Sequence, residues 1–408
     1  MLLARIAAIV AATVTLPFSA FAQTEPPTWH VMQDGVAFGL FNHQAKPRGG
    51  DEFRVPNWWM GMFSRKVGRT DFTINTMISL DPLTVGKKGY RELFQVGEAF
   101  EGKPLIDYQH PHDLFMQVAA VWRIPIGART GVTFAGGPSA EPALGPVAFM
   151  HRASSLENPM SPLAHHTLDS THIAFGAATA AVDHGPWTIE ASVFNGREPD
   201  EDRWDFDFGP LDSFSGRVWF RPREQWELQV SSGRLEAPEE LGHGDIVRTT
   251  ASASWLEVNG EDFTAATAAY GLNNGSEVNR GAFLLEATKR SGRQSWFGRL
   301  EYVQAETGTL LRDALVPHEE KDIISALTLG AVRELPRLGR MNIGLGGALT
   351  FYAVPDRLQG TYGDRPVSFQ VFLRIRPASG PMGRMWNMHM IKPMRPGAVD
   401  PHAGHHMP

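Results

Sequence analysis

Five histidines in two short segments are the residues of this sequence whose types and spacing are best suited to chemistry. Segment 108–113 reads "YQHPHD", and segment 163–172 reads "LAHHTLDSTH". The histidines are His110, His112, His165, His166 and His172. Imidazole is a good ligand for Cu(II), Zn(II) and Ni(II), and nearby carboxylates such as Asp113 and Asp169 can fix its tautomer. If the fold brings the two segments together, we expect a metal site.

Two other interpretations of these segments stay open. In the first, the histidines are polar residues at the rim of a barrel, and they hydrogen-bond to loop backbone without binding a ligand. In the second, Ser170, Asp169 and either His166 or His172 supply the residue types of a Ser–His–acid triad. The nucleophile-elbow motif that accompanies many such serines is missing from this sequence, so hydrolysis is the weakest hypothesis.

The C-terminal segment 378–408 is rich in methionine and histidine. Six of the 15 methionines of the chain fall between Met382 and Met407. Thioethers favour Cu(I) and imidazole suits copper and zinc, so the combination predicts bound copper, with silver as a chemical analogue. The candidate ligands are Met385, Met388, His389, Met390, His402, His405 and His406. The alternative is a disordered tail whose compositional bias is accidental.

Composition limits where the chain works and what it binds. Residues 1–22 combine Arg5, an apolar run and a small-residue ending at Ala22, a pattern typical of a cleaved secretory signal peptide. Cysteine is absent, so a metal site must use histidine, methionine, carboxylate or backbone oxygen. The net charge of −6 argues against a nucleic-acid partner. We therefore expect the mature chain to work outside the cytoplasm.

Period-two alternation of apolar and polar residues dominates the rest of the chain. Trp187, Ile189 and Val193 share one face of an extended segment, and Thr188 and Glu190 share the other. Such alternation is typical of β-strands that separate an apolar from a polar surface. The same pattern occurs at 71–80, 295–304 and 367–377. Helical periodicity is not sustained anywhere in the sequence.

The connections between the expected strands alternate between short and long. The short ones are 124–129, 183–186, 221–224, 259–262 and 291–294, and the long ones are 82–111, 137–169, 195–212, 234–245, 306–322 and 354–366. A transmembrane antiparallel β-barrel of the outer membrane has this asymmetry, with short periplasmic turns and long extracellular loops. We count about 16 strands, in a range of about 14–18. A soluble β-sandwich or propeller also has many short strands, but gives no reason for this alternation.

The predicted organisation is therefore all-β, with a signal peptide at 1–22, an outer-membrane barrel at 23–377 and a periplasmic tail at 378–408. An even strand count places both ends of the barrel on the periplasmic side. Loops 82–111 and 137–169 then lie outside the cell or fold into the lumen.

The position of these loops places both histidine segments at one rim, on neighbouring hairpins. If 163–172 is extended, His166, Ser170 and His172 point the same way. Charged residues along the predicted strands and the second long loop are expected to line the lumen. They are Arg123, Arg152, Glu190, Arg217 and Arg299.

Three stretches resemble a largely uncharacterised family of proteobacterial outer-membrane β-barrel proteins. They are "YQHPHDLFMQVAAVW", "FMHRASSLENPMSPLAHHTLDSTHIAFG" and "RPVSFQVFLRIRP". The resemblance covers most of the mature chain, and the two histidine motifs are its most specific part. It implies an outer-membrane location and, because members often lie beside copper- and heavy-metal-resistance genes, a role in metal handling. It implies no catalytic residues.

The favoured hypothesis is thus a porin-like outer-membrane barrel that binds copper or another heavy metal and contributes to metal tolerance. Its partners are membrane lipid and metal ions or small solutes. A passive porin with structural histidines is the first alternative. An outer-membrane hydrolase using Ser170 is the second.

Overall fold

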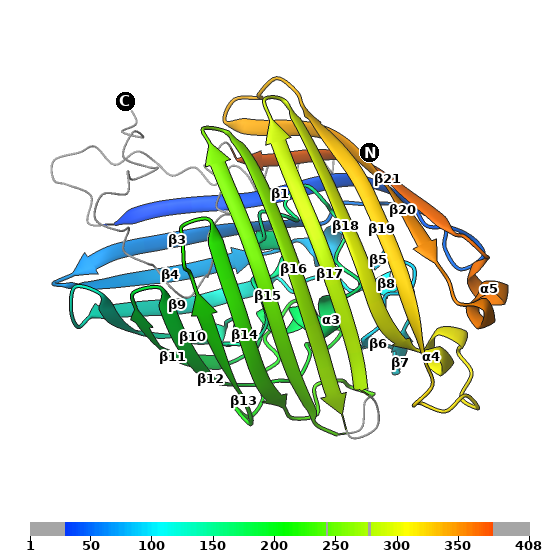
Figure 1. Ribbon diagram of the computed structural model, residues 1–408, viewed down its shortest axis with the longest axis horizontal. Helices are drawn as coiled ribbons and strands as arrows, with labels where there is room; N and C mark the ends of the chain where they lie inside the picture. The colour runs from blue at the N-terminus through cyan, green and yellow to red at the C-terminus, as the bar shows by residue number, and fades with distance from the viewer. Residues whose placement is uncertain (1–28, 242–243, 276–278, 378–408) are drawn as a thin grey trace.

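Sixteen strands form a closed antiparallel β-barrel in the computed structural model, which describes residues 29–241, 244–275 and 279–377 (Figure 1). The wall strands are β1 (His30–His43), β3 (Asn57–Val67), β4 (Thr70–Ile78), β9 (Phe115–Pro125), β10 (Thr130–Ser139), β11 (Ala177–His184), β12 (Trp187–Phe194), β13 (Ser213–Phe220), β14 (Trp226–Leu235), β15 (Ile246–Asn259), β16 (Asp262–Gly275), β17 (Asn279–Ser291), β18 (Gln294–Glu306), β19 (Lys321–Glu334), β20 (Met341–Ala353) and β21 (Val367–Pro377). The predicted fold class and strand count are confirmed. The proposed signal peptide and tail lie outside the described residues.

Strand β1 closes the barrel by pairing with two partners. Its first half, up to Ala37, pairs with β3, and its second half, from Ala37, pairs with the last strand β21. The short strand β2 (Asp51–Arg54) extends the sheet beside the second half of β1. Every other wall strand pairs with its neighbours along the chain, so the barrel is a simple up-and-down meander.

The two ends of the barrel differ as the sequence predicts. Short turns lie at one end, here named the turn end, and the long connections lie at the other, the loop end (Figure 1). The turns between β15 and β16 and between β17 and β18 have two residues each and begin with Gly260 and Gly292, at φ values of 60° and 55°. Tight antiparallel hairpins require this left-handed conformation, which glycine adopts without strain.

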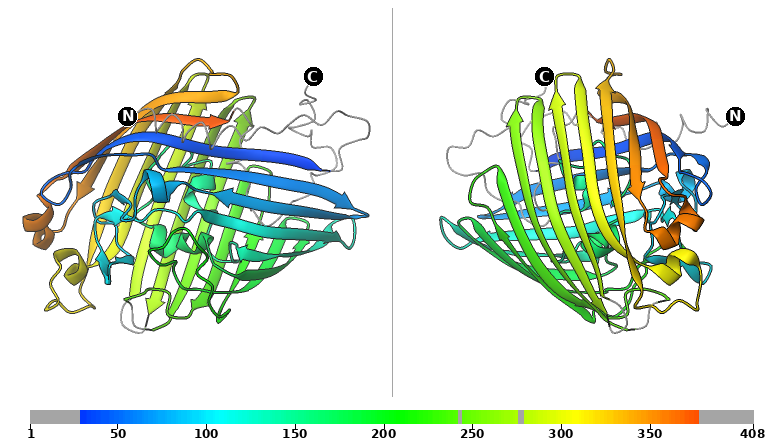
Figure 2. Two further views of the ribbon diagram at one scale, coloured as in Figure 1. Left: turned by 180° about the vertical axis from the view of Figure 1, so that it is seen from behind. Right: turned by 45° about the vertical axis from the view of Figure 1, so that its right-hand side comes forward.

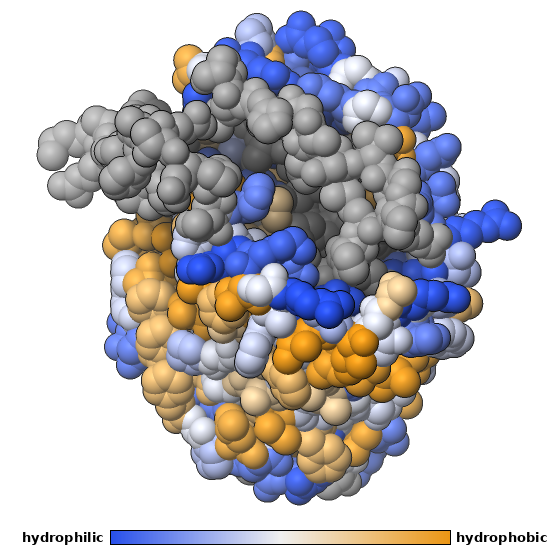
Figure 3. Space-filling view, turned by 90° about the vertical axis from the view of Figure 1, so that its left-hand side faces the viewer, coloured by the Kyte–Doolittle hydropathy of each residue, from blue (hydrophilic) through white to orange (hydrophobic). Residues whose placement is uncertain are grey.

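Alternation along each strand separates an apolar outer face from a polar inner face. On β12, Ile189 is 59% exposed while the adjacent Glu190 is 2% exposed. Hydrophobic side chains gather accordingly over much of the outer wall in Figure 3. Close to the turns the outer face carries large exposed indoles, which resemble the aromatic girdle of membrane barrels. These are Trp122, Trp187, Trp226 and Trp296.

Two long connections, 79–114 and 140–176, fold into the barrel and are named the plug (Figure 2). The plug holds only short elements: α2 (Asp81–Thr84), β5 (Tyr90–Arg91), β6 (Glu98–Phe100), β7 (Lys103–Leu105), β8 (Tyr108–Gln109), α3 (His165–Leu168) and 3-10 turns at Phe149–His151 and Ser170–His172. Leu93, Phe94 and Leu168 of the plug pack in one buried cluster with Leu284 and Ile324 of the wall. This burial of apolar surface fixes the plug against the second half of the barrel.

Two further helices lie at the loop end, α4 (Thr307–Leu311) and α5 (Asp356–Tyr362). Among the residues described, no helix has the length and apolarity needed to cross a membrane.

Candidate metal site in the lumen

Buried ion pairs connect the plug to the inner wall. All five charges that the sequence placed in the lumen are buried there, which confirms that prediction. On the wall, Arg123 binds Asp183 at 2.8 Å, and the Arg217 Nε donates to Glu190 at 2.7 Å. Arg217 also binds Glu141 of the plug at 3.0 Å, so charges of both signs are paired along the wall and between the wall and the plug.

The segment 163–172 does not form the extended strand entry that the sequence suggested. It folds into α3 and a 3-10 turn, and β11 begins only at Ala177. Inside the lumen this segment pairs with no wall strand, so some of its backbone groups bond locally: the Leu168 N–H donates to the Ala164 carbonyl, and the Asp169 N–H to that of His165. Others bond to side chains of the wall, as the His166 carbonyl does when it accepts from Arg248 at 2.7 Å. The expectation that His166, Ser170 and His172 share one extended face was therefore wrong.

The two histidine segments nevertheless meet, as predicted, although in the lumen instead of at the rim. The ring centroids of His110 and His166 lie 5.7 Å apart, and those of His112 and His172 lie 6.0 Å apart. His165 lies between the two pairs, with its centroid 5.4 Å from that of His172 and 6.3 Å from that of His110. The five imidazoles form one group, named here the histidine cluster.

His165 belongs to a buried ion-pair network that we name the clasp, made of Arg152, His165, Asp169 and Glu286. The two oxygens of Asp169 accept hydrogen bonds from His165 Nδ1 at 2.7 Å and from Arg152 Nη1 at 2.5 Å. The Arg152 Nε donates to Glu286 of β17 at 2.6 Å. Burial raises the pKa of Asp169, but the Arg152 guanidinium and His165 outweigh it and hold this pKa below its usual range. The clasp therefore ties the plug to the wall.

His112 and His172, like His165, each bond through Nδ1 to an oxygen atom of the plug. The Nδ1 of His112 donates to Asp81 at 2.9 Å, and the Nδ1 of His172 donates to the Asp169 carbonyl at 2.8 Å. In each ring the proton is thereby placed on Nδ1, which leaves Nε2 with its lone pair when the imidazole is neutral. The Nε2 of His172 is buried without a hydrogen-bond partner.

Glu98, His110 and His166 make up a second arrangement, named here the lumen site. One ligand atom from each lies within 4.8 Å of the other two. The His110 Nδ1 donates to the Pro111 carbonyl at 3.1 Å, so its Nε2 faces Glu98 Oε1 at 2.7 Å without the geometry of a hydrogen bond. The Nδ1 of His166 is also buried without a hydrogen bond and lies 3.4 Å from Glu198. The three ligand atoms thus lie close enough together to share one metal ion.

Burial controls the charge of the lumen site. It lowers the pKa of His110 well below its ordinary value and lowers that of His166, so both rings are neutral at pH 7. Burial also raises the pKa of Glu98, and the Arg203 guanidinium, 3.1 Å away, opposes this rise. Neutral imidazoles beside a carboxylate are the form in which these groups bind metal ions.

A glycine allows the site to form. Gly97 has a φ of 131°, and a Cβ built there would lie 2.5 Å from Cγ of the His166 ring. The backbone next to Glu98 can therefore approach this ring only because residue 97 has no side chain.

Two cavities adjoin the lumen site. One of about 20 Å³ is bounded by Glu98, His110, His172 and Glu198, and has room for a water-sized occupant. The other, of about 180 Å³, lies against loop-end segments, and most of the charged side chains that line it are acidic. Its polar lining comprises Glu98, Glu239, Glu240, Asp245, Arg280, Glu306, Thr309 and His318. Because Glu98 borders both, it connects the acidic vestibule with the histidines.

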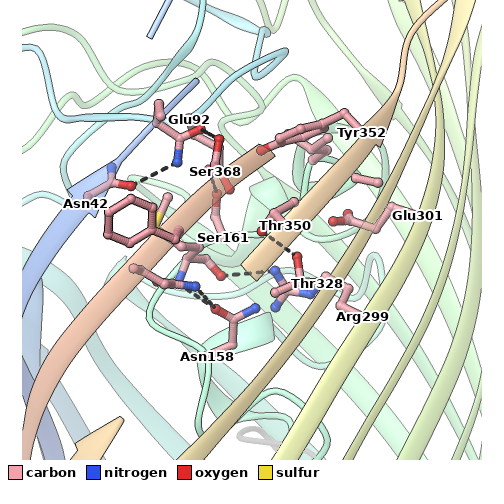
Figure 4. Close-up of a pocket in the computed structure, with 16 residues that line it drawn as sticks. Asn42, Glu92, Asn158, Ser161, Arg299, Glu301, Thr328, Thr350, Tyr352 and Ser368 are labelled. Carbon is pink, nitrogen blue, oxygen red and sulfur yellow. Dashed lines mark hydrogen bonds between the residues drawn. The ribbon is translucent and has the colours of Figure 1, made fainter. Parts of the chain in front are cut away.

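A further polar pocket lies between the plug and strands β18 to β21 (Figure 4). It measures about 20 Å³ and is crossed by hydrogen bonds such as Ser161 Oγ to Glu92 at 2.7 Å. Burial raises the pKa of Glu92 to about 8. Arg299 reaches the plug here, donating to the Met160 carbonyl at 3.0 Å. These contacts around the pocket hold the plug against the wall.

Ser170 is not placed as a nucleophile. Its hydroxyl accepts a hydrogen bond from Arg248 Nη1 at 2.9 Å, and Asp169 is engaged by Arg152 and His165. Within the part of the chain that the structure describes, no histidine ring accepts a hydrogen bond from the Ser170 hydroxyl. A cation beside the hydroxyl does not remove its proton as a base would.

The sequence-predicted ligands of the tail and two glutamates of the lumen differ in how the structure treats them. The tail ligands Met385, Met388, His389, Met390, His402, His405 and His406 lie outside the described residues. Glu98 and Glu198, in contrast, are prominent in the site but were missed from the sequence. They stand in loop segments without periodicity, and the adjacent Gly97 was the one local signal.

The barrel, its turns and its inward-folded loops define the class of the fold as that of the bacterial porins. The structure resembles OprB of Pseudomonas putida with a TM-score of 0.52 at 8% identity, over 86% of this chain and 94% of that one. It resembles the anion-selective porin of Comamonas acidovorans with a TM-score of 0.51 at 12% identity, over 85% and 99% of the two chains. For OmpF of Salmonella typhi the TM-score is 0.51 at 10% identity, over 85% and 97%. No protein-family model and no curated protein matches the chain.

Proposed function

We propose that this chain is a porin-like protein of the bacterial outer membrane, with its loop end outside the cell and its turn end, and hence its C-terminal tail, in the periplasm. The apolar outer wall, the exposed indoles near the turns and the porin-like fold support this location. The signal-like segment 1–22 agrees with it. After cell fractionation the protein should separate with outer-membrane lipid.

We further propose that the barrel binds a transition-metal ion, copper first, and contributes to copper or heavy-metal tolerance. One observation carries this proposal: Glu98, His110 and His166 bring one ligand atom each within 4.8 Å of the others inside the lumen, and a buried nitrogen of each imidazole has no hydrogen-bond partner. Buried acceptors that face each other repel unless a cation lies between them. Two imidazoles and a carboxylate suit a divalent ion, and Cu(II) binds such donors more tightly than Zn(II).

The tail is the second part of the proposed function. Its thioethers and imidazoles suit Cu(I), so it captures copper on the periplasmic side. The resemblance of the sequence to barrels found beside metal-resistance genes supports the same role. A synthetic peptide of residues 381–408 should bind Cu(I) tightly, and no binding at micromolar metal would remove this part.

The purified full-length protein provides the direct test of the lumen site. Titration with CuCl2 or ZnCl2 should reveal one ion per chain that is lost in Glu98→Gln, His110→Ala and His166→Ala. His184→Ala is a matched control, because His184 is exposed at a turn and pairs only with Thr130. Equal binding by all four variants and the parent protein would contradict the proposed site.

The cellular role needs its own experiment. Cells with and without the gene should differ in metal content and in survival under copper, silver and zinc. If neither differs for any of these metals, the role in tolerance is wrong even when the site binds metal in vitro.

A passive porin with structural histidines is the second candidate. It is favoured by His112, His165 and His172, each of which has a hydrogen-bonded oxygen partner. Planar-bilayer conductance separates the two functions. Conductance that does not change when copper is added, and that is the same in the His110→Ala and His166→Ala variants, would favour the passive channel.

A further inference from the structure

Methionines gather on the inner wall in a second place, which adjoins the histidine cluster through Phe149 and His165 but shares no residue with the lumen site. Six of the eight methionines in the described residues lie in or against one buried cluster, here named the methionine patch. They are Met32, Met60, Met62, Met77, Met116 and Met150. The first five belong to β1, β3, β4 and β9, and Met150 comes from the plug.

Strand register places these side chains beside one another. Met32 is the cross-strand partner of Met62, and Met60 is the partner of Met77. Met60 and Met62 are two residues apart, so they share the inner face of β3. Directly opposed side chains in an antiparallel pair have Cβ atoms about 4.5–5.5 Å apart, which brings long thioethers into contact. Met60 and Met62 are each 1% exposed and Met77 is 3% exposed.

The composition of this cluster differs from that of the largest cluster between plug and wall. The largest buried cluster of the described chain, between the plug and β16 to β20, has 19 members and includes no methionine. The methionine patch has ten buried members, and five of them are methionine. Both clusters fill the space between plug and wall with apolar side chains. They differ in that the methionine patch carries sulfur atoms.

The surroundings of the patch suit a soft cation. Thioethers prefer Cu(I) and its analogue Ag(I) over harder ions. Trp58 is a member of the cluster, and its ring lies 5.0 Å from that of the buried His151. An indole face attracts cations, and an imidazole offers a nitrogen donor. Methionine side chains are flexible enough to close around an ion.

We propose that the methionine patch is a binding site for a soft monovalent ion, Cu(I) or Ag(I), held by thioethers of Met60, Met62, Met77, Met116 and Met150. This site is separate from the lumen site in residues and in donor type. The barrel therefore offers nitrogen and oxygen donors to a divalent ion in one place and sulfur donors to a monovalent ion in another.

The test uses the full-length protein with ¹³C-labelled methionine methyl groups and silver nitrate as the probe. Single Met→Leu variants assign the methyl resonances. One equivalent of Ag(I) beyond that bound by the tail should shift the resonances of Met60, Met62, Met77 and Met116. The combined variant with leucine at these four positions should bind one Ag(I) fewer per chain, because leucine keeps the volume and removes the sulfur.

Met160→Leu is the matched control, because Met160 is 7% exposed but packs in another cluster. It should leave the Ag(I) stoichiometry unchanged. Unshifted patch resonances at saturating Ag(I) would overturn the proposal, and this holds even if the combined variant fails to fold. Binding of Zn(II) at the lumen site should be the same in the combined variant, so failure of either site is seen independently of the other.

Discussion

Two imidazole–carboxylate pairs lie a few ångströms apart in the plug, and they differ in where their protons and charges go. His165 and Asp169 approach to 2.7 Å, and so do His110 and Glu98. In the first pair, both carboxylate oxygens accept hydrogen bonds. In the second, the imidazole proton is committed to the Pro111 carbonyl, and a lone pair faces Glu98.

The comparison shows that residue type and distance do not separate a structural histidine from a ligand. Hydrogen-bond partners distinguish the two roles better. A buried donor or acceptor without a partner costs free energy, which a bound ligand or proton recovers. By this criterion the clasp has a structural role, and the lumen site is the better candidate for a metal site. Four changes to the chain put this distinction to the test.

Replacement of Arg152 by leucine should have the largest effect. It removes the guanidinium that Asp169 and Glu286 share and leaves Glu286 with its longer contact to Arg299 at 3.3 Å, which costs about 3–5 kcal/mol of unfolding free energy. Urea unfolding in detergent measures this cost. Arg197→Leu, which removes a partly exposed pair with Asp212, should cost only about 0–1 kcal/mol. Equal costs would mean that the clasp does not hold the plug.

Asp169→Asn should cost less, about 1–3 kcal/mol at pH 7, because Arg152 keeps Glu286. The pKa of Asp169 lies below its ordinary value of 3.8, so its charged form stabilises the fold above that value. As the pH falls below 3.8, the unfolded chain takes up the proton first and this stabilisation is lost progressively. The difference between parent and variant should therefore be smaller at pH 3 than at pH 7. A pH-independent difference would show that the carboxylate charge is irrelevant.

Gly97→Ala should act on the lumen site and spare the clasp. The added methyl group collides with the His166 ring, so metal affinity should fall by about 10–100-fold, as for other residues that position ligands. Gly102→Ala is the control, since Gly102 also has a positive φ, of 65°, but nothing lies within 4 Å of its Cβ position. Equal affinity in both variants would argue against His166 as a ligand.

Ser170→Ala should have the smallest effect. It removes one acceptor from Arg248, for a cost of about 0.5–1.5 kcal/mol, and leaves metal affinity unchanged. An ester-hydrolysing activity that the parent shows and this variant lacks would revive the hydrolase hypothesis. Ser232→Ala, at an exposed serine paired with Thr249, provides the baseline for such a change.

The wall could be predicted from the sequence because its signal is local. Alternation of single residues decides which face of a strand is apolar, and residues 187–193 showed it without knowledge of any partner strand. The strand count and the asymmetry between turns and loops followed from the same pattern. The wall needs no information about distant contacts, apart from its closure through β1.

The interior was predicted only in part, because distant contacts determine it. The meeting of the histidine segments followed from loop order, but their depth in the lumen did not. The helical turn at His165 arises because the plug has no strand to pair with there. Glu98 comes close to His110 and His166 through tertiary packing, which cannot be inferred from the spacing of these residues in the sequence. The methionine patch likewise emerged only when four strands were placed side by side.

The attachment of the plug has a consequence for how the barrel is made. Glu157 of the plug pairs with Arg374 of the last wall strand, 217 residues later, and Arg152 pairs with a residue 134 positions further along the chain. Contacts so distant in sequence form slowly, because the loop entropy is lost before the contact is gained. The plug is therefore synthesised before the strands that seat it, and its ion pairs with β17 and β21 can form only once those later strands exist.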